Sequence, residues 1–140
     1  MDKIILIAGP TGIGKTAASV SVAKKIDGEI ISADSMQIYR KMDIGTAKIM
    51  PDEMKGIPHH LIDIVEPYDE FSVKDFDDMS KTAIKEISGR SNIPVIAGGT
   101  GLYINAIVYD MDYNKVTTDS EFRNELWKYY EEKGTEELYN

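Results

Sequence analysis

Residues 9–16 read GPTGIGKT, directly after the apolar run 4–8 and before a helix-compatible segment. They match the pattern G-x-x-x-x-G-K-[ST], with Gly9, Gly14, Lys15 and Thr16 at its fixed positions. A loop of this kind directs successive backbone N–H groups to one point, where the lysine ammonium and the positive end of the next helix also act. The stretch therefore predicts a phosphate site between a buried strand and a helix. An ordinary glycine-rich turn would explain neither Lys15 nor Thr16.

The chemistry of the loop assigns a role to its two polar side chains. Lys15 is expected to contact the terminal phosphates, and the Thr16 hydroxyl to ligate a magnesium ion that bridges their oxygens. The loop leaves open whether these phosphates belong to a nucleotide such as ATP or to another diphosphate. The expected diphosphate-binding residues are Gly9, Pro10, Thr11, Gly12, Ile13, Gly14, Lys15 and Thr16.

Length and composition favour one folded domain of 140 residues, of which 42% are apolar. The chain has no cysteine, which excludes disulfides and thiolate metal sites. The apolar stretch near Met1 is too short for a signal peptide or a membrane span, so a soluble, cytoplasmic protein is expected. A net charge of −8 argues against non-specific capture of nucleic acid, although it leaves room for a locally basic groove.

The order of apolar runs and helical patterns predicts a parallel sheet with helical crossovers. The predicted strands are residues 3–8, 29–33 and 93–97, with residues 59–65 as a candidate fourth. The predicted helices are residues 15–26, ending near Gly28, then 73–89, capped by Ser72 and Asp75, then 102–109, and finally 118–133, capped by Thr118. Asp34 follows the second strand, so it is expected at the same sheet edge as the phosphate loop.

Two further segments carry functional residue types. Residues 34–48 read DSMQIYRKMDIGTAK and lack a regular period, which predicts a site-forming loop that leads into a helix. His59 and His60 are adjacent, so on a strand they would not face one ligand, and no third ligand lies at zinc spacing. The histidine pair is therefore expected to pack or to hydrogen-bond.

Four motifs in this order, GPTGIGKT, DSMQIYRKMDIGTAK, PHHLID and GGTGLY, resemble those of the tRNA dimethylallyltransferases, also called tRNA isopentenyltransferases. The resemblance covers residues 9–103 and implies a P-loop NTPase-like α/β fold, with a parallel sheet flanked by helices. It implies that residues 1–111 are the N-terminal part of this core and that residues 112–140 begin a helical tRNA-binding insertion that is cut short. Family members are about twice this length, so an incomplete core with an unpaired strand edge is expected.

The resemblance also implies a reaction: transfer of a dimethylallyl group from dimethylallyl diphosphate to N6 of an adenosine next to the anticodon in tRNA, with Mg²⁺. Asp34 would be the general base. The expected partners are dimethylallyl diphosphate and the tRNA anticodon stem-loop, with no membrane; the oligomeric state is left open, with a monomer expected for the complete enzyme. The residues expected to touch tRNA are Asp34, Ser35, Met36, Gln37, Thr100 and Arg123.

Alternatives remain open at the level of sequence. A small-molecule or nucleoside kinase would use the same loop, but residues 93–97 contain no aspartate of the kind that holds magnesium in such enzymes. A non-catalytic remnant would bind a diphosphate and transfer nothing. Asp34 could act only as a cap for the turn after its strand.

Overall fold

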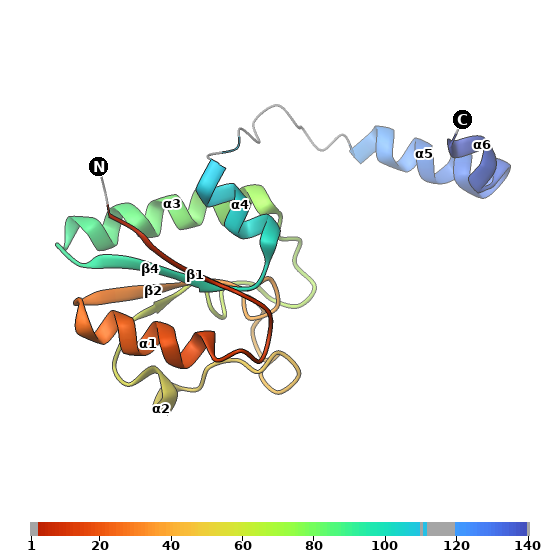
Figure 1. The fold of residues 1–140 in the computed structure, drawn as a ribbon. Coiled ribbons are helices and arrows are strands. Elements are labelled where there is room, and N and C mark those ends of the chain that lie inside the picture. The colour runs from red at the N-terminus through yellow and green to blue at the C-terminus, as the bar shows by residue number, and fades with distance from the viewer. Residues whose placement is uncertain (1–2, 110, 112–119, 140) are drawn as a thin grey trace.

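The computed structural model describes residues 3–109, 111 and 120–139 of the chain. Four strands alternate with helices along its core, and two further helices follow (Figure 1). The elements are β1 (Ile5–Ala8), α1 (Lys15–Lys25), β2 (Gly28–Ala33), α2 (Pro51–Met54), β3 (His59–His60), α3 (Val73–Gly89), β4 (Ile93–Gly98), α4 (Gly101–Tyr109), α5 (Ser120–Lys133) and α6 (Thr135–Tyr139).

The strands form one parallel sheet in the order β1-β4-β2-β3. Ala8 and Ala33 both pair with Gly98, so β1, β2 and β4 end at the same edge of the sheet. Helix α1 lies on one face, and α3 and α4 lie on the other (Figure 1). The predicted fold class, a parallel sheet flanked by helices, is confirmed.

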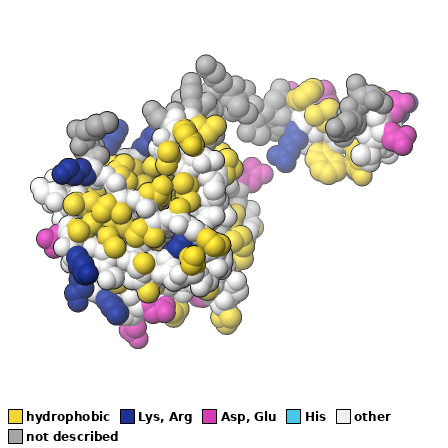
Figure 2. Space-filling view, in the orientation of Figure 1, with side chains coloured by type: hydrophobic (Ala, Val, Ile, Leu, Met, Phe, Trp, Pro, Cys, Tyr) yellow, Lys and Arg dark blue, Asp and Glu magenta, His cyan; other side chains and the backbone are white. Residues whose placement is uncertain are grey.

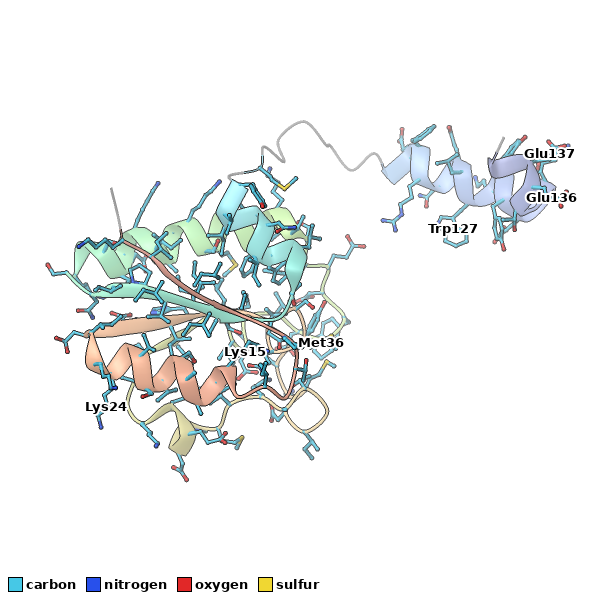
Figure 3. All side chains as sticks on the ribbon, viewed as in Figure 1. Lys15, Lys24, Met36, Trp127, Glu136 and Glu137 are labelled. Atoms are coloured by element: carbon cyan, nitrogen blue, oxygen red, sulfur yellow. The ribbon has the colours of Figure 1, made fainter. Side chains whose placement is uncertain are left out.

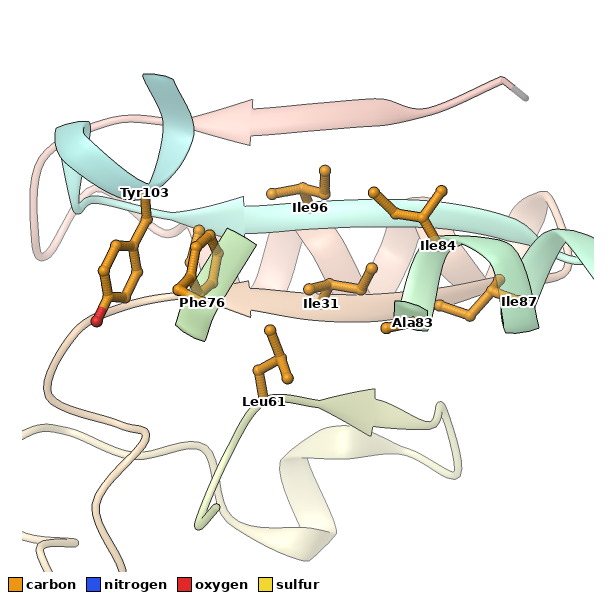
Figure 4. Packing of buried hydrophobic residues seen from close by; sticks show 9 residues of the cluster. Ile31, Leu61, Phe76, Ala83, Ile84, Ile87, Ile96 and Tyr103 are labelled. Atoms are coloured by element: carbon orange, nitrogen blue, oxygen red, sulfur yellow. The ribbon is translucent and has the colours of Figure 1, made fainter. Parts of the chain in front are cut away.

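The larger core cluster lies between the sheet and helices α3 and α4 (Figure 4). Ile31 and Ile96 from the sheet pack there with the fully buried Phe76 of α3. The ring of Phe76 stacks on Tyr103 of α4, with the ring centroids 3.9 Å apart. This contact fixes the beginning of α4 over the end of the sheet, close to the phosphate loop.

The other face of the sheet is covered by α1. Val20 and Ala23 of that helix pack on Ile30 of β2 and Val95 of β4, together with Ile49 from the loop before α2. Ile49 thereby ties the 34–50 segment to the core, which matters because this segment forms one wall of the site.

Two predicted boundaries need correction. Helix α1 ends at Lys25, and the turn uses Asp27, with a φ of 51°, in place of Gly28. Gly28 begins β2 instead, where a Cβ would lie only 2.9 Å from the carbonyl oxygen of Ile93, so glycine is needed for close approach. The candidate strand 59–65 shrinks to two residues because Leu61 and Asp63 adopt positive φ values of 60° and 55°.

The predicted cap of α3 is confirmed. The Ser72 hydroxyl accepts a hydrogen bond from the Asp75 N–H at 3.2 Å, and the Asp75 carboxylate accepts one from the Ser72 N–H at 2.8 Å. The hydrogen bonds from Ser72 lower the pKa of Asp75. Helix α5 begins at Ser120, and the predicted cap Thr118 lies outside the described residues.

The outer edge of β1 has no neighbouring strand within the described part of the chain, as predicted. Ile4 and Leu6 there are 41% and 40% exposed, and Figure 2 shows hydrophobic side chains gathered over this side of the molecule. Among the described residues, no helix combines the length and apolar character that a membrane crossing requires.

Candidate functional site

The loop between β1 and α1 has the backbone that its glycines predict. Gly12 and Gly14 have φ values of 83° and 89°, a region that side-chain-bearing residues rarely adopt. Gly14 is the N-cap of α1, and its carbonyl accepts the first helical hydrogen bond, from the Ala18 N–H at 3.1 Å. The N-terminal end of α1 therefore opens into the loop, where its unpaired N–H groups favour an anion.

Lys15 folds over this loop. Its Nζ donates a hydrogen bond to the carbonyl oxygen of Pro10 at 2.6 Å. A Cβ at Gly99, in the turn after β4, would lie 3.6 Å from this ammonium and 3.1 Å from the carbonyl oxygen of Gly9. The two glycine-rich turns thus meet at Lys15, and Figure 3 shows its side chain at the end of the sheet where Met36 also lies.

A cavity of about 320 Å³ opens at this sheet edge. Its walls come from the phosphate loop, the ends of β2 and β4, and the loop before α2. The polar side chains that line it and could act chemically are Lys15, Thr16, Asp34, Gln37 and His59. The cavity therefore combines a glycine-rich turn, an ammonium and a carboxylate.

Asp34 has a structural task in addition to its place in the cavity. Its Oδ1 accepts hydrogen bonds from the backbone N–H groups of Met36, at 2.9 Å, and Gln37, at 3.3 Å. This is the capping geometry of an Asx-type turn. No hydrogen bond joins Oδ2 to any described residue, so the carboxylate keeps one oxygen for a ligand while the other shapes the turn.

Thr100 connects the end of β4 to the segment after β2. Its Oγ1 accepts a hydrogen bond from the Ser35 N–H at 2.9 Å and donates one to the Ser35 Oγ at 3.2 Å. Its own N–H donates to the carbonyl oxygen of Ala33 at 3.2 Å. A Cβ at Gly98 would collide with the same Ala33 backbone, which explains the glycine there.

Gln37 closes the cavity on the side of the loop before α2. Its Nε2 donates weak hydrogen bonds, both at 3.5 Å, to the carbonyl oxygens of Thr46 and Ala47. Ala47 has a φ of 48°, an unusual conformation for alanine. The hydrogen bonds of Lys48 hold this loop in place.

The side chain of Lys48 is only 4% exposed and ties three parts of the loop together. Its Nζ donates to the carbonyl oxygen of Tyr39 at 2.7 Å, to Asp43 Oδ1 at 2.8 Å, and to Asp63 Oδ1. Burial by itself lowers the pKa of Lys48, but the bonds to Asp43 and Asp63 outweigh it and raise the pKa above its ordinary value. Lys48 is therefore a charged internal brace.

The two histidines hydrogen-bond, as predicted, but in different places. His59 Nδ1 lies 2.7 Å from the carbonyl oxygen of Ile57, which can only accept, so Nδ1 carries the proton. Burial lowers the pKa of His59, so its ring is neutral near pH 7 and lines the cavity without a charge. His60 Nε2 instead bonds Glu29 Oε2 at 2.7 Å, toward the start of β2.

The structure unites some of the predicted site residues and not others. Asp34 and Gln37 line the same cavity as the loop residues Thr11, Gly12, Gly14, Lys15 and Thr16. Ser35, Met36 and Thr100 adjoin this cavity through their hydrogen bonds but do not line it. Arg123 is exposed on α5 and is not among the lining residues.

Sequence reasoning missed two residues of the site. The sequence predicts that His59 packs or hydrogen-bonds, and its place in the cavity wall depends on the pairing of β3 with β2. Lys48 carries a local signal, since a lysine shortly after the aspartate of DIGTAK suggests an internal ion pair, but its second partner, Asp63, is remote in sequence.

Magnesium would have to rely on oxygen atoms that a ligand brings. The described residues contain no group of three or more His, Cys, Asp or Glu side chains able to hold a metal. Thr16 and Asp34 do line one cavity, and no hydrogen bond joins the Thr16 hydroxyl to another described residue. A hydroxyl, a carboxylate and phosphate oxygens form the kind of sparse oxygen set that Mg²⁺ accepts beside nucleotides and diphosphates.

Comparison with known proteins finds similar sequences among enzymes named for their action on tRNA. The sequence profile of the family described as IPP transferase matches residues 37–140. A tRNA dimethylallyltransferase of Caldanaerobacter subterraneus is 55% identical over 137 residues, which are 98% of this chain and 44% of the relative. A tRNA dimethylallyltransferase of Geobacillus thermodenitrificans is 51% identical over 138 residues and is likewise covered to 44%.

Solved structures agree with the sequence matches. The tRNA isopentenylpyrophosphate transferase of Bacillus halodurans superposes with a TM-score of 0.81 at 48% identity, over 96% of this chain and 44% of that protein. A eukaryotic dimethylallyltransferase acting on tRNA superposes with a TM-score of 0.80 at 34% identity, over 90% of this chain and 32% of that protein. The chain thus spans less than half the length of these relatives.

Proposed function

The chain belongs to the IPP transferase family, and on this premise we propose that its cavity serves the transfer of a dimethylallyl group from dimethylallyl diphosphate to N6 of an adenosine next to the anticodon in tRNA. The observation that supports the proposal is that Lys15 and Asp34 line one cavity. A phosphate-binding ammonium and a carboxylate are the two groups that this reaction needs on opposite sides of the transferred carbon.

The donor diphosphate would lie in the phosphate loop. As the bond between the allylic carbon and the diphosphate oxygen breaks, negative charge builds on the leaving oxygens. The N–H groups at the start of α1 and the Lys15 ammonium stabilise that charge where it develops, so the barrier to bond cleavage falls. Thr16 would help to hold the magnesium ion that the family resemblance implies, and that ion would supply further neutralisation of the charge on the leaving group.

The acceptor nitrogen is a weak nucleophile because the lone pair of the exocyclic amine is delocalised into the adenine ring. As the new bond from N6 to carbon forms, the amine must lose one proton. Asp34 is the carboxylate of the cavity available to take it, through the oxygen that does not cap the turn. The products are N6-dimethylallyladenosine, diphosphate and one proton.

The adenine must leave its stack to reach a carboxylate inside a cavity of this kind. Gln37 lines the same cavity and has an amide able to pair with a base edge. His59 adds a neutral ring, which suits an uncharged purine better than an imidazolium would. We place the adenosine between Asp34 and Gln37 on these grounds.

The test is a transfer assay on the 140-residue chain with dimethylallyl diphosphate, labelled in the prenyl group, and an anticodon stem-loop RNA in magnesium buffer. Label on N6 of the adenosine is the expected result, and an RNA with guanosine at that position should remain unlabelled. Phosphoryl transfer from ATP to a small acceptor would select the kinase alternative. Diphosphate binding without any transfer would restrict this chain to donor binding.

A further inference from the structure

We propose that a second groove, between α1 and α2, binds the phosphate backbone of the RNA on either side of the modified nucleotide; this rests on the proposed function, because it assumes an RNA substrate. The groove has a volume of about 570 Å³ and contains three lysines, Lys24, Lys25 and Lys55. None of these three lysines is predicted as a site residue from the sequence, whereas Gly14 and Thr16, which also line the groove, are. The groove that contains these three lysines is called the lysine groove.

The lysine groove is electropositive in a chain that is otherwise acidic. Its three ammonium groups face one carboxylate, that of Glu53. Glu53 Oε2 is already engaged, since it accepts a hydrogen bond from the Met50 N–H at 2.9 Å in the cap of α2. None of the three lysines forms an ion pair or hydrogen bond with another residue in the part of the chain that the structure describes. Their charges are therefore available to a ligand.

The position of these lysines is not explained by helix capping alone. Lys24 and Lys25 lie in the last turn of α1, where positive charge interacts favourably with the helix C-terminus. Lys55 comes from the end of α2, where its φ of 50° is a conformation that lysine seldom adopts. Convergence of charges from two separate elements is what an anion site requires. Figure 2 shows Lys and Arg side chains gathered at the end of α1 where Figure 3 labels Lys24.

The dimensions of the groove favour an extended anion. It runs along α1 from Thr16 to Lys25, a distance of about 13 Å at a rise of about 1.5 Å per residue. One phosphate group would occupy only a fraction of that length, whereas successive phosphates of a polynucleotide would follow it. The Ser21 hydroxyl lines the same wall and adds a neutral hydrogen-bond donor.

The groove also adjoins the candidate active site. Gly14 and Thr16 line both the lysine groove and the cavity that contains Asp34. A nucleotide whose base enters the cavity would leave its neighbouring phosphates near this shared wall. With a net charge of −8, the chain as a whole repels RNA, so a local strip of positive charge would both attract the strand and set its direction.

The experiment measures binding of a fluorescent anticodon stem-loop RNA to the 140-residue chain at several salt concentrations. The variant Lys24→Gln/Lys25→Gln/Lys55→Gln is compared with Lys3→Gln/Lys74→Gln/Lys85→Gln, which removes the same charge from exposed lysines elsewhere. We expect the groove variant to bind RNA at least about tenfold more weakly in 0.1 M salt. Its plot of log affinity against log salt should flatten by about 2, since each phosphate contact contributes roughly 0.7.

Pyrophosphate affinity is the internal reference, because Lys15 and the loop backbone are unchanged in both variants; it should stay within about twofold of the parent chain. Equal RNA affinity of the groove variant and the parent chain would overturn the proposal, as would an equal loss in the matched control. A loss of pyrophosphate binding with RNA binding intact would assign the groove to small anions. Binding of a polyglutamate peptide is measured in the same way. If the groove variant lost affinity for this peptide and bound RNA like the parent chain, the groove would be assigned to acidic proteins.

These outcomes are separable from the proposed reaction. If the parent chain transfers the prenyl group and the groove variant binds RNA normally, the lysine groove is wrong and the reaction stands. If the groove variant loses RNA affinity but no transfer occurs in the parent chain, the groove stands and the reaction is wrong. Absence of RNA binding by the parent chain would overturn the groove irrespective of the transfer assay.

Discussion

The hydroxyl of Thr100 accepts a hydrogen bond from the backbone N–H of Ser35 at 2.9 Å, across 65 positions of sequence. This bond joins the turn after β4 to the segment that begins with Asp34. Because Asp34 is held by the same segment, the position of the carboxylate relative to the phosphate loop depends on a side chain that was predicted to contact tRNA. The structure gives Thr100 a positioning role in the free protein.

We expect Thr100→Val, which keeps the shape and removes the hydroxyl, to leave the Ser35 N–H without its partner. The free energy of unfolding should fall by about 1 kcal/mol, the usual cost of such a loss at a half-buried site. Urea unfolding measures it, and Thr100→Ser should recover most of the stability. If Thr100 acted only by touching tRNA, the valine variant would unfold like the parent chain and lose RNA affinity alone.

Asp34→Asn separates the two tasks of Asp34. The asparagine Oδ1 can still accept from the N–H groups of Met36 and Gln37, so the turn should survive, with a change in unfolding free energy of less than about 0.5 kcal/mol. Proton removal from the adenine amine is lost, so prenyl transfer should fall by roughly 10²–10⁴-fold. Single-turnover transfer kinetics and urea unfolding measure the two effects.

Asp34→Ala is the matched comparison, because alanine removes both the base and the turn cap. It should lose transfer to the same extent and stability in addition, by about 1 kcal/mol. Full activity in the asparagine variant would show that Asp34 acts only as the cap of the turn after β2.

The features that the sequence predicted well depend on residues that lie within a few positions of one another. The phosphate loop depends on Gly12 and Gly14, whose positive φ values follow from the absence of a Cβ. The start of α3 depends on Ser72 and Asp75, three residues apart. Local chemistry decides such elements, so they are readable without the fold.

The features that were missed depend on contacts between distant segments. Residues 61–65 have the composition of a strand. The Asp63 N–H, however, donates to the carbonyl oxygen of Gln37, and the Asp63 carboxylate accepts a hydrogen bond from Lys48. These contacts bend the chain out of the sheet. His59 reaches the cavity only because β3 lies beside β2. No periodicity in the sequence indicates the contacts of Asp63 or the pairing of β3 with β2.

The contacts of Glu29 predict that the free energy of unfolding falls at acid pH. The hydrogen bond from Arg90, at 2.8 Å, is the main cause that lowers the pKa of Glu29 from 4.5 to about 2, and bonds from His60 and Asn92 add to it against the opposing effect of burial. In the unfolded chain the carboxyl takes up its proton near pH 4.5. The stabilisation is therefore complete above that pH and is lost as the pH falls from about 4.5 towards 2.

The variant Glu29→Gln tests the direction of this pH dependence. Its deficit in unfolding free energy, measured by urea titration against the parent chain, should be largest between pH 5 and pH 7 and should shrink steadily on acidification below about 4.5. Glu70→Gln, at an exposed position, should show no such convergence. A deficit that stayed constant down to pH 2.5 would mean that the charge of Glu29 has no special partner.

Lys48 makes the strongest prediction about the architecture of the site, because it braces the loop that carries Ala47 and receives Gln37. Replacing it by methionine keeps most of its volume but removes the donor shared by Tyr39, Asp43 and Asp63. The two carboxylates are 52% and 48% exposed, so water compensates them in part. We expect a loss of about 1–3 kcal/mol in unfolding free energy.

The consequence for function should differ from that of losing Lys15. Among the described residues, Lys48 hydrogen-bonds Tyr39, Asp43 and Asp63 and no residue of the phosphate loop. Lys48→Met should therefore bind pyrophosphate within about twofold of the parent chain, whereas Lys15→Ala should bind it about 10- to 100-fold more weakly. In Lys48→Met the KM for RNA should rise more than kcat falls, because the wall against the adenosine loosens. A double-mutant cycle with Asp63→Asn then decides the cause: if the brace acts through this ion pair, the two losses will not add, and strictly additive losses would show that Lys48 stabilises the loop by packing alone.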